Sequence, residues 1–144
     1  MRLADLNLLI YVVNRAAPQH EAARQWLEDR LGGDETLALS WTVILGFLRL
    51  TTSHRVFERP LPLERANVLI DEWLCHPGVE VLVLGERYWS ILRALLLESG
   101  IAGNLTSDAH LAALAIEHEG ELHSADTAFQ RFRGLRWVNP LAVR

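Results

Sequence analysis

The chain has 144 residues, of which half are apolar and 22% are charged, and its formal net charge is −4. This composition excludes an intrinsically disordered chain, and the length suffices for one domain with a sizeable hydrophobic core. The one cysteine, Cys75, excludes a disulfide framework and a thiolate metal site. No apolar run reaches the ~18 residues that a transmembrane helix needs. We therefore expect a single cytoplasmic domain over residues 1–144 that does not associate with membranes.

Apolar periodicity, capping residues and glycine or proline stops predict strands that alternate with helices. In chain order the predicted elements are a strand at 2–5, helices at 7–14 and 18–33, a strand at 36–40, helices at 41–52 and 63–76, a buried strand at 79–84, helices at 86–100 and 104–120, a strand at 121–126, a helical turn at 127–132 and a strand at 135–140. Ser40 is the expected cap of the helix at 41–52, and Thr106 or Ser107 that of the helix at 104–120.

This alternation predicts an α/β protein, a three-layer α/β/α sandwich around a central, mostly parallel sheet. Catalytic and binding groups of such sheets gather at the carboxyl ends of the strands. The position of each acidic residue relative to these ends therefore indicates whether it belongs to a site or to a polar helix face.

Three of the acidic residues lie at strand ends or helix starts. Asp5 ends the first strand inside an apolar run, Asp108 lies in the first turn of the helix at 104–120, and Asp126 closes the strand at 121–126. Taken singly, Asp108 and Asp126 are explained at least as well as helix-terminus residues favoured by the helix dipole. An ionised Asp5 among apolar neighbours needs a partner, because an isolated buried charge is too costly to keep.

Together the three acids suggest carboxylates that converge at one edge of the sheet. Like charges at close range raise one another's pKa unless a divalent cation neutralises them. Hard oxygen ligands, without a cysteine or a histidine pair, favour Mg²⁺ or Mn²⁺ over Zn²⁺. Carboxylate-bound Mg²⁺ with an activated water is a usual apparatus for phosphodiester hydrolysis. The residues therefore predict a metal-dependent nuclease site at Asp5, Asp108 and Asp126.

Four segments resemble the PIN-domain ribonucleases, specifically the VapC toxins of type II toxin–antitoxin systems. They are "LADLNLLIYVVN", "LSWTVILGFLRLTTSHRVFERPL", "GNLTSDAHLAALAIEHEGELHSAD" and "FQRFRGLRWVNPL". The resemblance covers essentially the whole chain and implies a single PIN domain over residues 1–144, Mg²⁺- or Mn²⁺-dependent cleavage of RNA, and inhibition by a VapB-like antitoxin. By the same analogy the substrate is a structured RNA, either transfer RNA or ribosomal RNA.

Matched to the family position by position, Asp5 is the first acid, Asp108 the third and Asp126 the fourth. The resemblance implies that Asp5 and Asp108 are the principal metal ligands, that Asp126 acts directly or through water, and that Asn7 orients the site by hydrogen bonds. Gly46 stands where many PIN domains place a glutamate. With three acids instead of four we expect weaker metal binding, because affinity for hard cations depends partly on ligand charge.

The candidate substrate contacts each have a structural alternative. Arg49, one helical turn beyond Gly46, could bind an RNA phosphate or pair with a local acid. Thr51 could contact the RNA backbone or cap its helix. Ser124, two residues before Asp126, could bond a carboxylate or simply pair in its strand. His110 and His123 are not expected to be metal ligands, because no second histidine stands at metal-binding spacing.

All fourteen basic residues are arginine, and the tail after Asp126 carries four of them and no acid: Arg131, Arg133, Arg136 and Arg144. Arginine is the better bidentate partner for phosphate, so this uneven charge suits an RNA substrate. A compositional bias of the source genome explains the missing lysines at least as well.

Two other classes of function are consistent with parts of the sequence. A PIN-fold module that binds RNA or an antitoxin without turnover would account for Gly46. A phosphoacceptor receiver domain also gathers acids around Mg²⁺ at strand ends, but it needs a late strand that ends in lysine, and the chain has none. The apolar helices before Pro60 predict a homodimer, with one or two tryptophans exposed at a dimer or antitoxin interface.

Overall fold

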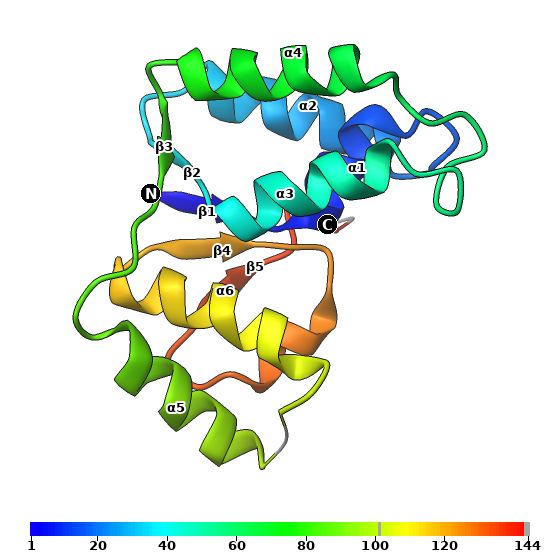
Figure 1. Cartoon of the computed structure of the whole chain (residues 1–144). Helices are drawn as coiled ribbons and strands as arrows, with labels where there is room; N and C mark the ends of the chain where they lie inside the picture. Colours follow the sequence, from blue (N-terminus) through cyan, green and yellow to red (C-terminus); the bar gives the residue numbers. More distant parts are fainter. Residues whose placement is uncertain (101, 143–144) are drawn as a thin grey trace.

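The computed structural model describes residues 1–100 and 102–142, so the predicted tail arginine at position 144 lies outside the described residues. Strands and helices alternate along the chain (Figure 1). They are β1 (Arg2–Ala4), α1 (Leu6–Val13), α2 (His20–Leu31), β2 (Leu37–Leu39), α3 (Trp41–Thr51), α4 (Leu63–Cys75), β3 (Val79–Val81), α5 (Tyr88–Ser99), α6 (Leu105–Glu117), β4 (Glu121–His123), the 3₁₀ helix η1 (Thr127–Arg131) and β5 (Arg136–Val138).

The five strands form one sheet with the order β3-β2-β1-β4-β5, and every pairing in it is parallel. Parallel neighbours need crossover connections, and right-handed crossovers fix the face on which each helix lies. The chain moves outward from β1 to β3 through α1–α4, then returns to β4 through α5 and α6. Figure 1 accordingly shows α1–α4 on one face of the sheet and α5 and α6 on the other. The predicted three-layer α/β/α sandwich is confirmed.

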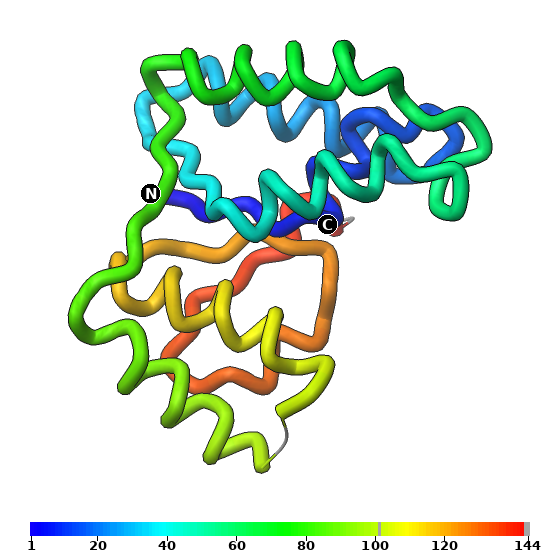
Figure 2. Tube along the Cα trace, viewed as in Figure 1, coloured from blue at the N-terminus to red at the C-terminus, as the bar shows by residue number. Residues whose placement is uncertain are grey.

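The direction of winding reverses between β1 and β4, which lie next to each other at the centre of the sheet. At such a switch point the two connections leave for opposite faces and open a crevice outside the carboxyl ends of the strands. The Cα trace follows this divergence: the chain after β1 turns into the α1 layer, and the chain after β4 turns toward η1 and the α6 layer (Figure 2).

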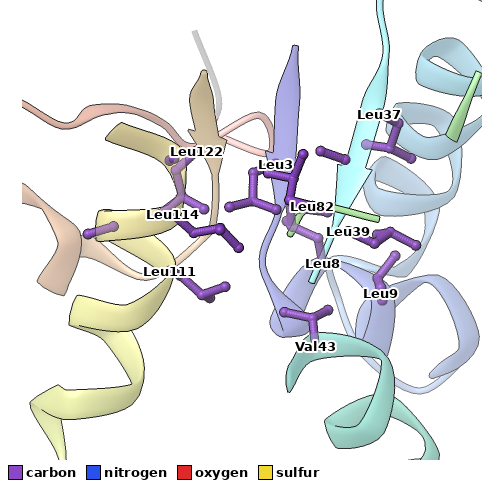
Figure 3. Packing of buried hydrophobic residues seen from close by; sticks show 14 of the residues in the cluster. Leu3, Leu8, Leu9, Leu37, Leu39, Val43, Leu82, Leu111, Leu114 and Leu122 are labelled. Carbon is purple, nitrogen blue, oxygen red and sulfur yellow. The ribbon is translucent and has the colours of Figure 1, made fainter. Parts of the chain in front are cut away.

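Alternate residues of the central strands serve the two faces of the sheet. Leu3 and Leu122 pair across β1 and β4 and pack toward Leu111 and Leu114 of α6 (Figure 3). Both strand leucines are 0% exposed. On the opposite face Ala4 is also fully buried, and its small side chain leaves room for the α1–α2 layer. The core thus fixes the strand ends on which the acids lie.

Several predicted helix ends are confirmed and one is wrong. The side chain of Ser40 accepts a hydrogen bond from the Val43 amide as the N-cap of α3, and Gly100 ends α5 in the left-handed conformation with a φ of 70°. Neither Thr106 nor Ser107 caps α6, because the helix already begins at Leu105. Asp108 remains in the first turn, as predicted.

The predicted buried strand at 79–84 is too long. It ends at Val81, and the side chains of Val83 and Leu84 are 75% and 54% exposed. A hydrogen bond from the Leu82 amide to the Leu39 carbonyl is the last link to β2, after which the chain leaves the sheet. Among the described residues no helix is long and apolar enough to span a bilayer.

Candidate active site

The site begins where β1 and β4 end side by side. Ala4 pairs with His123, so the next residues, Asp5 and Ser124, are neighbours across the two strands. The Asp5 amide donates to the His123 carbonyl at 2.9 Å. Asp5 also begins α1: its backbone is extended, and its Oδ1 accepts from the Leu6 amide at 2.7 Å. The carboxylate is therefore held at the switch point by both backbone and side chain.

Ser124 is the centre of a hydrogen-bond network that joins β4 to β1. Its Oγ donates to Asp5 Oδ2 at 2.7 Å and accepts from Asn7 Nδ2 at 3.2 Å and from the Asp126 amide at 3.0 Å. A serine hydroxyl has one donor and two acceptor positions, so all three are in use. The side chain is also 0% exposed. Ser124 is therefore a positioning residue for Asp5, which confirms the carboxylate bond considered from sequence and leaves its hydroxyl no capacity for a direct substrate contact.

Asn7 lies on the first turn of α1 and completes this network. Besides its bond to Ser124, its Oδ1 accepts from the Ala125 amide at 3.4 Å. The asparagine thus links the start of α1 to the segment that carries Asp126. These two bonds agree with the orienting role that the family resemblance implies for Asn7.

The other two acids approach from the opposite layer. Asp126 caps η1, with Oδ1 accepting from the Ala128 amide at 2.9 Å, and its side chain is exposed. Asp108 lies half-buried in the first turn of α6. Figure 1 shows η1, the orange turn that follows β4, beside the N-terminal end of α6.

The three carboxylates act on one another electrostatically. Burial raises the pKa of Asp5; the hydrogen bonds from Ser124 and Leu6 lower it, and the charges of Asp108 and Asp126 raise it again. Burial and the charge of Asp126 likewise raise the pKa of Asp108, whereas the charge of Arg131 lowers it. Because the charges of Asp108 and Asp126 act on Asp5, and that of Asp126 acts on Asp108, the three residues lie near one another despite their separation along the chain.

The donor chemistry of this cluster fits a hard divalent cation. All the candidate ligands are carboxylate oxygens, and the pKa values of Asp5 and Asp108 are raised first by burial and then by the charge of neighbouring acids. Within residues 1–100 and 102–142, no three acidic, histidine or cysteine side chains are placed so that together they could hold a metal ion. Mg²⁺ usually keeps several waters and is held by one or two carboxylates, so three protein ligands are not required. The arrangement suits a partly hydrated ion.

The structure separates the two remaining candidate substrate contacts. Arg49 is exposed on α3 and makes no hydrogen bond or ion pair with any described residue, so the predicted local salt bridge is not formed. Thr51 is 1% exposed, and its Oγ1 donates to the Phe47 carbonyl at 2.7 Å. The prediction of Thr51 as an RNA contact is therefore wrong, because its hydroxyl is buried and bonded to the backbone of its own helix.

The two histidines near the acids belong to other contacts. The indole N–H of Trp26 can only donate, so the Nδ1 of His123 accepts it at 3.0 Å and its Nε2–H donates to Glu121 at 2.7 Å. His110 is hydrogen-bonded to Tyr88 of α5. Burial lowers the pKa of both histidines, which keeps them neutral.

Gly46 has a packing reason as well as a place in the family pattern. A Cβ at this position would lie 2.7 Å from Cδ2 of Leu6, the residue after Asp5. The missing side chain lets α3 approach the first turn of α1 closely. A glutamate at position 46 would therefore have to displace Leu6 before it could join the acids.

Sequence reasoning missed the influence of Arg131 on Asp108. It noted this arginine only as part of a basic tail. The available signal was its position five residues after Asp126, at the end of the helical turn that follows the strand.

Comparisons with known proteins agree with this geometry. The model of the PIN domain family matches residues 3–135. Ribonuclease VapC33 of Mycobacterium tuberculosis is 43% identical over 141 residues, which cover 98% of this chain and 99% of that protein. The chain belongs to the PIN-domain family, among the VapC ribonucleases. Ribonuclease VapC37 of the same species is 38% identical over 143 residues, with 99% of both chains covered.

Solved structures of the family share the fold at lower identity. VapBC2 of Rickettsia felis, bound to a DNA fragment from its promoter, matches with a TM-score of 0.69 and 22% identity, covering 96% of this chain and 97% of that one. M. tuberculosis VapC20, described as a sarcin-ricin loop cleaving toxin, matches with a TM-score of 0.68 and 14% identity, covering 94% and 99%. These likenesses establish the architecture of this VapC chain.

The raised pKa of Asp108 predicts a pH-dependent stability difference. A carboxyl whose pKa is higher in the folded than in the unfolded protein favours folding at low pH, and this contribution is lost as the pH rises through the folded-state pKa. In a chelator, the Asp108→Asn variant should therefore gain stability over the wild type as the pH rises from about 4 to 7. The gain should stay below about 1 kcal/mol, because solvent screens a half-exposed group.

Urea unfolding of the metal-free proteins at several pH values measures this difference. Asp71→Asn is the control, since Asp71 is an exposed helix-face acid. A stability difference between Asp108→Asn and wild type that does not change with pH would contradict the electrostatic account.

Proposed function

We propose that this chain is a divalent-metal-dependent endoribonuclease and the toxin of a type II toxin–antitoxin pair. The observation that carries the proposal is the gathering of Asp5, Asp108 and Asp126 near the switch point of the sheet, where the charges of Asp108 and Asp126 raise the pKa of Asp5. Membership of the VapC ribonucleases supports the reaction class. Mg²⁺ is the proposed cofactor, with Mn²⁺ as a substitute.

Some residues of the site would hold the metal, and others orient these ligands. Asp5 and Asp108 are the proposed principal metal ligands, and Asp126 contributes directly or through water. When bound, the metal supplies an activated water and polarises the scissile phosphate. Ser124 and the Leu6 amide fix both oxygens of Asp5, so the carboxylate needs little reorientation on binding. Asn7 keeps the start of α1 aligned with the Asp126 segment.

The proposed substrate is a structured RNA, in transfer RNA or ribosomal RNA. Arg49 supports this proposal because its guanidinium is exposed and unpaired among the described residues. M. tuberculosis VapC20 is described as a toxin that cleaves the sarcin-ricin loop, so this loop is a first choice of substrate for testing.

A VapB-like antitoxin is the proposed inhibitor. Several structural relatives of the chain were solved as toxin–antitoxin complexes, among them VapBC-1 of nontypeable Haemophilus influenzae with a TM-score of 0.69. An antitoxin that neutralises the enzyme must block either the acids or access to them.

A homodimer is proposed through an apolar surface formed by Trp41, Leu45, Val83 and Leu84. Their side chains are 54%, 58%, 75% and 54% exposed. Trp41 and Leu45 lie one turn apart on α3. The segment with Trp41 and Leu45 follows β2 and the segment with Val83 and Leu84 follows β3, and these strands end side by side because Leu39 pairs with Val81. An exposed apolar surface of this kind is typical of protein interfaces, and a second copy can cover it symmetrically.

A PIN-fold module without turnover remains the alternative. Gly46 favours it, because the fourth carboxylate is missing and, among the described residues, no three acidic, histidine or cysteine side chains could together hold a metal ion. Saturable binding of Mn²⁺ in the millimolar range or below, measured by calorimetry, would argue against a dead site.

The nuclease proposal predicts that cleavage of RNA requires both Mg²⁺ or Mn²⁺ and Asp5. Asp5→Asn should lower kcat/KM at least about a hundredfold. It removes a charged metal ligand, and it replaces one of the two oxygens that accept hydrogen bonds from Ser124 and the Leu6 amide. Gel analysis of transfer RNA and ribosomal RNA fragments measures this rate. Asp71→Asn is the control for a helix-face acid, and equal cleavage by wild type and Asp5→Asn would remove Asp5 from the mechanism.

The dimer proposal predicts that Leu45→Glu weakens self-association of the chain alone by about tenfold or more, because a charge would replace an apolar contact at the interface. Light scattering coupled to size exclusion measures the mass over a range of concentrations. Leu97→Glu is the matched control, since Leu97 is 75% exposed on α5 outside this surface. A wild type that stays monomeric at all concentrations would contradict the proposal and leave the surface to the antitoxin.

A further inference from the structure

Arg131 and Asp126 are both fixed by the backbone of one residue, Ala128. The Ala128 amide donates to Asp126 Oδ1 at 2.9 Å, and the Ala128 carbonyl accepts from Arg131 Nε at 3.1 Å. One short turn, η1, thus presents a carboxylate at its start and a guanidinium at its end. This turn lies beside the N-terminal end of α6, where Asp108 is found (Figure 1).

Arg131 lies at the acidic site, because its guanidinium and the carboxylate of Asp126 are bonded to the two ends of the same residue, Ala128. The guanidinium is nevertheless no buried counterion. The residue is exposed, and among the described residues it forms no ion pair within 4.0 Å of a carboxylate. Its guanidinium therefore lies near the site acids with most of its hydrogen-bond donors unused by the described residues.

The hydrogen-bonding capacity of Arg131 points to an external anion. Guanidinium has five N–H donors, and the bond to Ala128 uses only the one on Nε. Among the described residues, neither terminal NH₂ group of Arg131 has a hydrogen-bond acceptor. Such a fork matches the oxygens of a phosphate in two parallel hydrogen bonds, and an RNA phosphate that approaches three carboxylates needs a cation beside it.

We propose that Arg131 binds the RNA phosphate at or next to the cleaved bond through its two terminal NH₂ groups. This inference rests on the proposed nuclease function and assigns the site a substrate-binding residue opposite its carboxylates. Arg131 differs in this role from Arg49, because Arg131 is bonded to the same residue, Ala128, as the site acid Asp126.

Arg133 provides a matched control two residues away. It is also exposed, but it lines a different hollow, of about 420 Å³, together with Ser90, Ile91 and Glu98. Arg131→Gln and Arg133→Gln remove the same charge from the same segment. Only Arg131→Gln removes a positive charge from the acidic site. Arg131→Lys keeps the charge and loses the planar fork.

The test compares these variants in three measurements on the full chain. Arg131→Gln should lower kcat/KM for RNA by roughly 10- to 100-fold, as expected for loss of hydrogen bonds to a charged group, and Arg131→Lys should recover only part of this. Binding of labelled transfer RNA and ribosomal RNA in a chelator should weaken, and the salt dependence of binding should fall by about one unit of slope. Arg133→Gln should leave kcat/KM unchanged.

Calorimetry with Mn²⁺ separates substrate binding from a structural role. Removing a positive charge beside Asp108 should tighten Mn²⁺ binding by about twofold or more, whereas a disturbed site would bind the ion more weakly. Arg131→Lys should bind Mn²⁺ as the wild type does. Weaker Mn²⁺ binding by Arg131→Gln would overturn the proposal.

The outcomes also separate this proposal from the nuclease function. If the wild type cleaves RNA and Arg131→Gln cleaves as fast as Arg133→Gln, the Arg131 proposal is wrong and the nuclease function stands. If the wild type binds RNA without cleaving it, the nuclease function fails, and the chelator measurement alone decides whether Arg131 binds phosphate. A wild type that binds neither transfer RNA nor ribosomal RNA would overturn both the Arg131 proposal and the nuclease function.

Discussion

The hydrogen bond from Ser124 to Asp5 joins the two halves of the molecule at the point where they diverge. β1 and β4 end side by side, and the chain leaves them for opposite faces of the sheet. The buried hydroxyl donates its one hydrogen bond to the carboxylate of Asp5. Its oxygen accepts hydrogen bonds from the side-chain amide of Asn7 and from the Asp126 backbone amide. The start of α1 on one side and the segment that leads to η1 on the other are both held by this one oxygen.

The same alignment concentrates negative charge that the protein alone does not neutralise. Asp5 and Asp108 both have raised pKa values, with burial as the largest cause. A fold selected only for stability would avoid such groups, because burial of a charged carboxylate and the approach of like charges both oppose folding. Strain of this kind is typical of functional sites, where a ligand supplies the missing charge. The leucine core around Leu3 and Leu122 provides the rigidity that keeps the acids together.

The sequence was sufficient for the order of elements, the parallel sheet and the placement of Asp5, because strand ends in an α/β chain meet at one edge. It was insufficient where tertiary contacts decide. Thr51 reads as an exposed polar residue, yet its hydroxyl bonds within α3. Glu117 reads as a helix-face acid, yet it accepts the amides of Gly85 and Arg87 and anchors the loop before α5. Val83 and Leu84 continue an apolar run that periodicity cannot distinguish from a buried strand.

The central claim is that Asp5 and Asp108, 103 residues apart in the chain, hold the same ion. A crystal structure of the chain grown with Mn²⁺, with anomalous diffraction recorded, measures this most directly. The account predicts an anomalous peak at about 2 Å from carboxylate oxygens of both residues, with water completing the coordination. An ion bound elsewhere, with these two carboxylates left in solvent at saturating Mn²⁺, would contradict it.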